Sequence, residues 1–558
     1  MRPRVRRPVR RSWRVLGAAL AVALVWFAVA GPDTVGDLTG PGLVALPLDG
    51  VLLLVLLSWV GTTWVRPTAP GRVKALWTVV GVFLGVVSLI RLLDLGFGWA
   101  LDRPFDPLSD WAYIGSARGL LADASTPLVA VLALVAAAAL VLGVLVALPW
   151  ALRRLARVAL HQRKGGRRAA VALGVAWVVC AAAGLQVAPD RPVATTGAVG
   201  VAAHHVVLAR DELRDRTAFD RGLAADAMRD APDEQLLTGL RGKDVLVVFV
   251  ESYGQVALKG PPQVTSSVHT ALDDASGQLA DLGWSSRSAW LRSPTFGGIS
   301  WLAHSTLESG LWVNSQGSYD QLLASDRLTL SGAFHRAGWR TVGVVPANQQ
   351  DWPEGIRFYG YDTLYDARAL GYAGPRFGYA TVPDQFTLKA FRDRELASPQ
   401  HQPVMAEIDL VSSHLPWTPL PRLLDWDHLG DGSAYTQVRD EALAKGTGGS
   451  WRTGVKAAYG RSIAYSIGSL VSFVQQSHDD NLVLVVLGDH QPASVVSGRG
   501  ASHDVPVTVI AHDPAVTARV GELWGWPKGL SPQSGAPVWR MDAFRDRFLT
   551  AFGPGQAP

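Results

Sequence analysis

The sequence predicts two structural parts: an N-terminal bundle of five transmembrane helices, and a C-terminal α/β domain with a mostly parallel central sheet and helices on both faces. Three observations support this prediction. Five apolar stretches of membrane-spanning length occupy the first third of the chain. After residue 241, strand-like runs alternate with helical segments. Two of these runs lead directly into acidic residues, where α/β domains commonly bind ligands.

The membrane part is predicted over residues 1–188, because a helix needs roughly 20 apolar residues to cross a bilayer. The predicted spans lie near residues 14–31, 43–64, 74–96, 126–150 and 169–188. Basic residues precede the first, third and fifth spans, whereas the other connections hold acidic residues such as Asp33 and Asp106. The positive-inside rule therefore places the N-terminus in the cytoplasm and everything after about residue 189 outside. Signal-peptide cleavage after Ala30 is an alternative that leaves the later spans unchanged.

Charge is distributed unevenly along the chain. Residues 1–188 hold 20 lysines and arginines against 8 acidic residues, whereas the remainder holds 32 against 39. The net charge of +5 therefore reflects a basic membrane part joined to a mildly acidic domain, and we expect no nucleic-acid partner. The one cysteine, Cys180, lies in an apolar stretch. This excludes an intrachain disulfide, and it excludes a cysteine nucleophile or cysteine-based zinc site in the C-terminal domain.

Residues 189–240 are predicted to form a helical juxtamembrane linker, and residues 241–558 the extracytoplasmic α/β domain. The strand-like runs of this domain cover residues 244–250, 340–345, 403–411, 482–487 and 505–511. Residues 319–337 and 456–477 have helical periodicity. Because ligands of such sheets gather at the carboxyl ends of the strands, side chains that follow different strands can converge there.

Carboxylates and a histidine follow two of the strand-like runs. Glu251 comes directly after the run 244–250, and Asp489 and His490 follow the run that ends at Gly488. A carboxylate is costly to bury unless it is paired or binds a metal ion. Carboxylate oxygen and imidazole nitrogen suit Zn²⁺ or Mn²⁺. We therefore predict a metal site formed by Glu251, Asp489 and His490, with a solvated strand-end carboxylate as the alternative for Glu251.

A serine is the candidate nucleophile. Ser300 follows Gly297-Gly298, which permits a close approach of the backbone. Because a serine hydroxyl is a poor nucleophile at neutral pH, it needs activation, and metal coordination is one route. On the sequence alone, Thr295, Ser305 and Thr306 compete with Ser300 for this role.

Further residues are candidates for contacting an anionic substrate. His414 ends a strand-like run and His503 precedes another, and either could hold an anionic oxygen, protonate a leaving group or bind a second metal ion. Arg357 could bind a phosphate group. Ordinary loop histidines and a surface ion pair are the alternative interpretations. His304, one turn after Ser300, could line the pocket.

The order of these motifs resembles that of the lipoteichoic acid synthase group. Its members are membrane-bound phosphoglycerol transferases in the sulfatase-like branch of the alkaline phosphatase superfamily. The motifs that carry the resemblance are Val-Glu251-Ser, Gly-Gly-x-Ser300, Ser-His414-x-Pro and Gly-Asp489-His490, after five predicted membrane helices. The resemblance covers nearly the whole chain and implies an alkaline phosphatase/sulfatase-like fold for the C-terminal domain.

The resemblance also implies site roles. One divalent metal ion, with manganese expected and zinc or magnesium as alternatives, would be bound by Glu251, Ser300, Asp489 and His490. His414 and Arg357 would bind substrate. His503 is similar to a histidine near the metal in related phosphoethanolamine transferases.

The implied reaction moves a phospho-headgroup, expected to be phosphoglycerol, from a membrane phospholipid to Ser300. A glycolipid or glycan of the cell envelope would then accept the group. The implied location is the bacterial plasma membrane, in which the protein would be multi-pass with its catalytic domain outside.

The chain departs from the family pattern in two respects. The nucleophile is Ser300 rather than threonine, and the residues after it differ, which leaves the substrate open. The formylglycine motif of sulfatases needs proline at position 302 and arginine at position 304, where this chain has Leu302 and His304. This argues against sulfate-ester hydrolysis. A metal-dependent phosphatase or phosphodiesterase and a non-catalytic lipid-binding or transport protein are the remaining alternatives.

Overall fold

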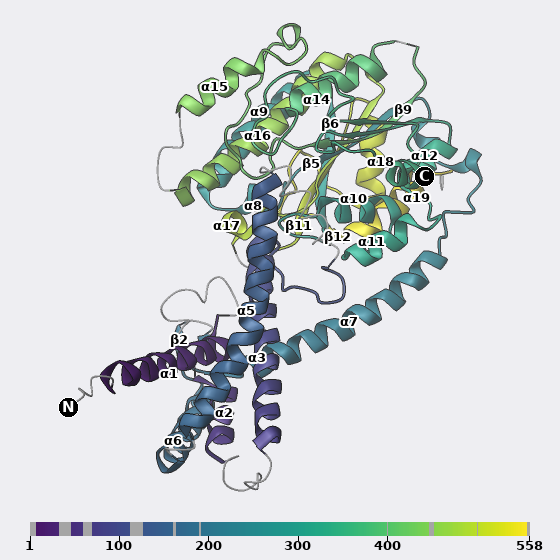
Figure 1. Cartoon of the computed structure of the whole chain (residues 1–558). Helices are drawn as coiled ribbons and strands as arrows, with labels where there is room; N and C mark the ends of the chain where they lie inside the picture. Colours follow the sequence, from purple (N-terminus) through teal and green to yellow (C-terminus); the bar gives the residue numbers. More distant parts are fainter. Residues whose placement is uncertain are drawn as a thin grey trace, which may run out of the picture. The chain divides into compact units, whose positions relative to one another are not determined.

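The computed structural model describes residues 7–32, 46–59, 70–111, 127–159, 163–188, 191–398, 400–445, 451–498 and 500–554. The chain divides into two compact units (Figure 1). The first contains residues 1–99 and 103–214, and the second contains residues 100–102 and 215–558. The division after Arg214 falls inside helix α7 (Ala198–Ala224).

The first unit consists mainly of apolar helices. They are α1 (Arg7–Ala30), α2 (Leu48–Trp59), α3 (Pro70–Ala100), α5 (Pro127–Ala159) and α6 (Arg163–Ala182). Two small sheets pair β1 (Leu46–Pro47) with β4 (Ala194–Thr195), and β2 (Gln186–Ala188) with β3 (Arg191–Pro192).

Three helical segments are long and apolar enough to cross a membrane: Gly71–Trp99, Val131–Ala159 and Gly165–Ala182. The apolar parts of α1 and α2 within the described residues are shorter, Val15–Ala30 and Leu48–Ser58. Residues 60–64 of the second predicted span lie outside the described residues. A helix is therefore found at each of the five predicted positions, while the five-span bundle itself stays a prediction.

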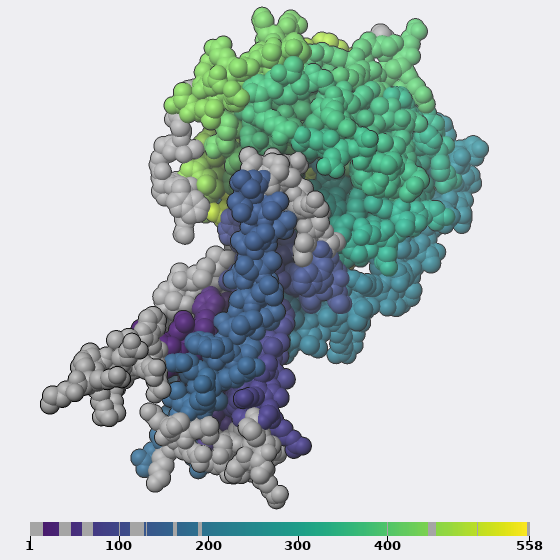
Figure 2. All heavy atoms as spheres, viewed as in Figure 1, coloured from purple at the N-terminus to yellow at the C-terminus, as the bar shows by residue number. Residues whose placement is uncertain are grey.

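Apolar side chains are exposed along α5. Leu132, Val135, Leu142 and Val146 are 57%, 60%, 65% and 69% exposed. Figure 2 shows α5, in blue, uncovered along much of its length on the face that is drawn. A continuous exposed apolar surface of this kind marks contact with lipid or with another apolar partner.

The second unit is built on an eight-stranded sheet with the strand order β12-β6-β11-β10-β5-β9-β7-β8. The strands are β5 (Asp244–Val250), β6 (Ser285–Arg292), β7 (Arg340–Val345), β8 (Thr363–Asp366), β9 (Val404–Leu410), β10 (Leu482–Gly488), β11 (Asp504–Ala511) and β12 (Val538–Arg540). From β10 to β8 all neighbours are parallel, as are β12 and β6, whereas β11 is antiparallel to both of its neighbours. The predicted mostly parallel sheet is confirmed.

The strands predicted from apolar runs coincide with β5, β7, β9, β10 and β11 to within one residue at each end. The pattern missed β6, which is polar over its first half yet pairs with β11 over eight residues. The segment 319–337 is not one helix. It contains the end of α11 (Gln316–Leu323) and all of α12 (Leu330–Arg336), and the Thr329 hydroxyl caps α12 by accepting from Gly332 N.

Helices cover both faces of the sheet, as predicted (Figure 1). Side chains of β5 alternate between the two faces. Leu246 and Val248 pack against α9 and α16, whereas Val247 and Phe249 belong to the core formed with α10, α12, α18 and α19. The helix bounds are α8 (Val256–Lys259), α9 (Pro262–Asp281), α10 (Ser300–Ser309), α13 (Pro353–Tyr359), α14 (Asp384–Phe391), α15 (Tyr435–Lys445), α16 (Trp451–Ser477), α17 (Ser494–Ser497), α18 (Pro514–Trp524) and α19 (Phe544–Phe552).

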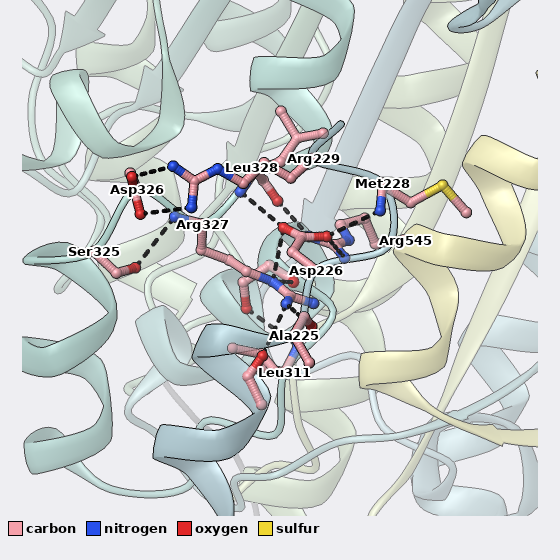
Figure 3. Close-up of polar contacts among 12 residues, drawn as sticks. Ala225, Asp226, Met228, Arg229, Leu311, Ser325, Asp326, Arg327, Leu328 and Arg545 are labelled. Carbon is pink, nitrogen blue, oxygen red and sulfur yellow. Dashed lines mark hydrogen bonds and ion pairs between the residues drawn. The ribbon is translucent and has the colours of Figure 1, made fainter. Parts of the chain in front are cut away.

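A buried ion-pair network fastens the segment after α7 to this domain (Figure 3). Asp226 Oδ1 lies 2.9 Å from Arg545 Nη2, and Asp226 Oδ2 lies 3.3 Å from Arg327 Nε. The three side chains are at most 3% exposed. Arg327 also donates to the carbonyl oxygen of Ser309, the last residue of α10. Burial alone would raise the pKa of Asp226, but the charge of Arg545, together with that of Arg327, holds it below its usual range.

We expect Asp226→Asn to lower the free energy of unfolding of the second unit by about 3–5 kcal/mol, because it leaves the buried Arg327 without its counter-charge and leaves Arg545 paired only with the half-exposed Asp546. Urea unfolding of the full-length protein in detergent, followed by tryptophan fluorescence, measures this. The matched control is Asp326→Asn, which breaks the exposed pair with Arg229 and should cost less than about 1 kcal/mol. Equal effects of the two variants would show that the buried network does not stabilise the domain.

Candidate metal centre and nucleophile

Three strand ends and one helix start converge at one edge of the sheet. Glu251 follows β5, Asp489 and His490 follow β10, and the segment with His414 follows β9. The two outer strands of this group flank β5 and run parallel to it, so all three carboxyl ends meet at the same edge. Ser300 begins α10, which packs over the face that Phe249 shares with Glu251.

The Ser300 hydroxyl lies between Glu251 and His490. Ser300 Oγ donates to Glu251 Oε2 at 3.1 Å and is 3.2 Å from His490 Nε2. Ile299, just before it, has a left-handed backbone with φ of 65°. A branched residue rarely adopts this conformation, which turns the chain sharply into α10. Gly297 N donates to the carbonyl oxygen of Gln491 and ties this turn to the end of β10.

The three competing hydroxyl groups point elsewhere. Thr295 Oγ1 donates to the Gly298 carbonyl oxygen, and Ser305 Oγ and Thr306 Oγ1 both donate to that of Leu302. Ser305 and Thr306 are fully buried in α10. None of the three has a hydrogen bond to Glu251 or His490 among the described residues. Of the four candidate hydroxyl groups, that of Ser300 is therefore the one that contacts Glu251 and His490.

One carboxylate oxygen in the group has no hydrogen-bond donor. Asp489 Oδ1 accepts from Ser252 N and from His490 N, both at 2.7 Å. Asp489 Oδ2 is buried without a hydrogen-bond partner and lies 3.4 Å from His490 Nε2. Leaving a buried acceptor unsatisfied is unfavourable. Burial and the negative charge of Glu251 raise the pKa of Asp489, and a cation at this point would relieve both effects.

The donor atoms fit a metal ion. His490 Nδ1 lies 2.8 Å from the Gln491 carbonyl oxygen, which can only accept, so Nδ1 carries the proton and the Nε2 lone pair faces the carboxylates. Ser300 Oγ lies 3.1 Å from Glu251 Oε2 and 3.2 Å from His490 Nε2. His490 Nε2 lies 3.4 Å from Asp489 Oδ2 and 3.5 Å from Glu251 Oε1. Ligands with bonds of about 2.1 Å around one ion are separated by about 3.0–3.4 Å. The three ionisable residues also form a compact group of potential ligands.

Of the other predicted site residues, His414 and His503 lie at the same edge of the sheet as Glu251, whereas Arg357 has no contact with the site among the described residues. His414 follows β9 and stacks on Tyr379 with ring centroids 3.8 Å apart. His503 precedes β11, whose antiparallel direction brings its start to the same edge, and its ring lies 5.3 Å from Phe296. Arg357 is exposed on α13, and among the described residues no hydrogen bond or ion pair joins it to the site.

A second metal through His414 or His503 stays a prediction. Within the described part of the chain, groups of three or more potential ligands number two, and neither includes these histidines. One is the Glu251 group. The other consists of His304, Glu407 and Asp409. Sequence reasoning missed Glu407 and Asp409, although two carboxylates at alternate positions of an otherwise apolar strand are a signal that could have found them.

The comparisons with known proteins gave matches among solved structures only. No protein-family model and no curated protein matches the chain. The lipoteichoic acid synthase LtaP from Listeria monocytogenes is 13% identical with a TM-score of 0.37, and the match covers 61% of this chain and 78% of that one. The phosphoglycerol transferase GacH from Streptococcus pyogenes, in complex with sn-glycerol-1-phosphate, is 14% identical with a TM-score of 0.32, covering 53% and 73%. The C-terminal periplasmic domain of EcEptC from Escherichia coli, in complex with Zn, is 11% identical with a TM-score of 0.36, covering 56% and 82%.

The expected resemblance is confirmed to this extent: the similar structures include a lipoteichoic acid synthase and a phosphoglycerol transferase. At these identities and TM-scores the likeness carries no argument about the chemistry of this chain.

We expect Asp489→Asn to lower the metal content of the protein by one ion per chain, because the unpaired carboxylate oxygen becomes an amide that binds metal weakly. The protein is stripped with EDTA, reloaded with Mn²⁺, desalted and analysed by plasma mass spectrometry. The control Asp425→Asn changes an exposed carboxylate and should leave the content unchanged. An unaltered metal content in Asp489→Asn would exclude this residue as a ligand.

Proposed function

We propose that the protein is a metal-dependent transferase that moves a phospho-headgroup, expected to be phosphoglycerol, from a membrane phospholipid to a cell-envelope glycolipid or glycan through a covalent intermediate on Ser300. The observation that carries the proposal is the position of the Ser300 hydroxyl between Glu251 Oε2 and His490 Nε2, beside the unpaired Asp489 Oδ2. This arrangement suits deprotonation of the Ser300 hydroxyl to an alkoxide nucleophile.

The proposed ligands of one divalent metal ion are Glu251, Ser300, Asp489 and His490. When bound, the ion would lower the pKa of the serine hydroxyl and offset charge on a phosphoryl oxygen. Oxygen and nitrogen donors of this kind suit Mn²⁺, which we expect, and also Zn²⁺ or Mg²⁺. The zinc complex among the similar structures supports keeping zinc as an alternative.

In the first step the Ser300 hydroxyl loses its proton and Oγ attacks the phosphorus atom of the headgroup. A bond forms between Oγ and phosphorus, the bond to the diacylglycerol oxygen breaks, and that oxygen takes up a proton. In the second step an acceptor hydroxyl loses its proton and attacks the same phosphorus, the bond between phosphorus and Ser300 Oγ breaks, and Oγ takes up a proton. The N-terminus of α10, of which Ser300 is the first residue, favours the negative phosphoryl group through the helix dipole.

His414 is the proposed proton donor to the diacylglycerol oxygen. It follows β9, is half-buried and stacks on Tyr379. His503 is proposed to hold a phosphoryl oxygen from the other side. Arg357 is proposed to bind the glycerol phosphate only if α13 carries it closer when substrate is present, because no contact joins it to the site among the described residues.

The membrane part is proposed to keep the enzyme beside its lipid substrate. The three apolar helices support a membrane protein. We propose five spans within residues 1–188, a linker over residues 189–240 and a catalytic domain over residues 241–558. The proposed location is the bacterial plasma membrane, with the N-terminus in the cytoplasm and the catalytic domain outside. Confinement to the outer leaflet brings donor and acceptor to the site by diffusion in two dimensions.

We expect metal-dependent release of diacylglycerol from phosphatidylglycerol, and a loss of at least about a thousandfold in Ser300→Ala, because the nucleophile is removed. Full-length protein in detergent with Mn²⁺ and a fluorescent lipid measures this rate. Ser305→Ala, which removes a hydroxyl five residues along the same helix, is the matched control and should keep the wild-type rate.

Product analysis separates the alternatives. Phosphoglycerol on an added glycolipid indicates transfer, whereas free glycerol phosphate indicates water as the acceptor and a phosphodiesterase. No release from phosphatidylglycerol, phosphatidylethanolamine or cardiolipin, with metal bound, would favour a lipid-binding protein without catalysis.

We expect His414→Gln to slow release by about 10²–10⁴-fold, the usual effect of losing a general acid, without changing the metal content. His428→Gln, which replaces an exposed histidine at 80% exposure, is the control. A rate for His414→Gln equal to that of the control would remove His414 from the mechanism.

A further inference from the structure

A second group of potential ligands lies under α10. Glu407 and Asp409 are two residues apart in β9, so both project to the face of the sheet that α10 covers. His304, one turn after Ser300, stacks on Phe249 with ring centroids 3.8 Å apart and an angle of 10° between the planes. This stacking fixes the imidazole ring over the strand that neighbours β9.

One imidazole nitrogen faces two carboxylates. His304 Nδ1 lies 2.9 Å from Glu407 Oε1 and 3.5 Å from Asp409 Oδ1. A single N–H makes one good hydrogen bond, and Asp409 Oδ1 is buried without a hydrogen-bond partner. These two distances lie just below and just above the separation of about 3.0–3.4 Å between ligand atoms around one ion. The three donor atoms all lie within 4.8 Å of one another.

A third buried carboxylate, that of Glu308, lies next to this group. Glu308 is fully buried on α10, one turn after His304. Its Oε2 accepts from the backbone N–H and the hydroxyl of Ser331, whereas Oε1 is buried without a partner. Its side chain interacts with that of Glu407. Two neighbouring buried carboxylates with an unpaired oxygen need a proton or a metal ion between them.

The hydrogen bonds around Glu407 also suit a carboxylate that binds a metal ion. Tyr361 OH donates to Glu407 Oε2 at 2.9 Å, which leaves Oε1 directed at His304. Metal-binding carboxylates are commonly oriented by such a hydrogen bond. If the three carboxylates are ionised, even a protonated His304 leaves two net negative charges in a buried space. One divalent cation offsets this charge.

We propose that His304, Glu407 and Asp409 form a second site for a divalent metal ion, separate from the group of Glu251, Asp489 and His490. One imidazole and two carboxylates suit Mn²⁺ or Zn²⁺. The ion links α10 to β9 and thereby holds the helix that begins at Ser300. The proposal does not depend on the reaction proposed above, because it concerns binding alone.

The test counts metal ions in the full-length protein in detergent. After EDTA treatment, reloading with Mn²⁺ and desalting, we expect two ions per chain in the wild type. We expect one in Glu407→Gln, one in Asp489→Asn, and none in the double variant. Asp384→Asn replaces a fully buried carboxylate elsewhere in the domain and should keep two ions.

A second measurement covers the case in which Glu407→Gln does not fold. In the Asp489→Asn background, Mn²⁺ should still raise the Tm, and adding Asp409→Asn should abolish that increase. One ion in the wild type together with one in Glu407→Gln would overturn the proposal and mean that protons balance the cluster. So would a Tm of Asp489→Asn that does not respond to Mn²⁺. Neither readout uses catalysis, so failure of the proposed transfer reaction would leave both unchanged.

Discussion

Negative charge concentrated at the carboxyl ends of buried parallel strands is the constraint on which the rest of the domain depends. β5 and β10 are buried over their whole length, and each leads directly into a carboxylate. Parallel pairing brings Glu251 and Asp489 to the same edge, where like charges repel and water is largely excluded. The metal ion that we propose here would offset this charge, and Glu251 already accepts a hydrogen bond from the Ser300 hydroxyl.

Helix α10 carries side chains that contact these carboxylates or lie beside them. Ser300, His304 and Glu308 recur every four residues, so they share one face of the helix. Ser300 meets the metal centre, His304 meets Glu407, and Glu308 is held by Ser331. At its far end the carbonyl oxygen of Ser309 accepts from Arg327, a member of the buried network with Asp226 (Figure 3). The position of the nucleophile is thereby fixed from both ends of a short helix.

Much of this could be predicted from local sequence. Glu251, Asp489 and His490 could be chosen as candidates because they follow unbroken apolar runs, and such a run predicts a buried strand in any context. The antiparallel direction of β11 could not be predicted, since an apolar run has the same composition in either direction. β6 was missed because its first half is polar although it lies inside the sheet.

Other features depend on contacts between distant residues. Ser300 could be separated from Thr295, Ser305 and Thr306 only by the hydrogen bonds that each hydroxyl makes. Glu407 and Asp409 look like an exposed strand face until α10 is placed over them. Arg357 was chosen by residue type, and an isolated arginine in a sequence carries no information about which surface it faces.

The most direct test of the central claim is mass spectrometry of the peptide that contains Ser300. The full-length protein is incubated with Mn²⁺ and phosphatidylglycerol without an acceptor, and then digested. The account predicts a phosphoglycerol adduct on Ser300 that appears only with metal and is absent in Asp489→Asn. Diacylglycerol release accompanied by an adduct on Thr295, Ser305 or Thr306, or by no adduct on this peptide at all, would contradict it.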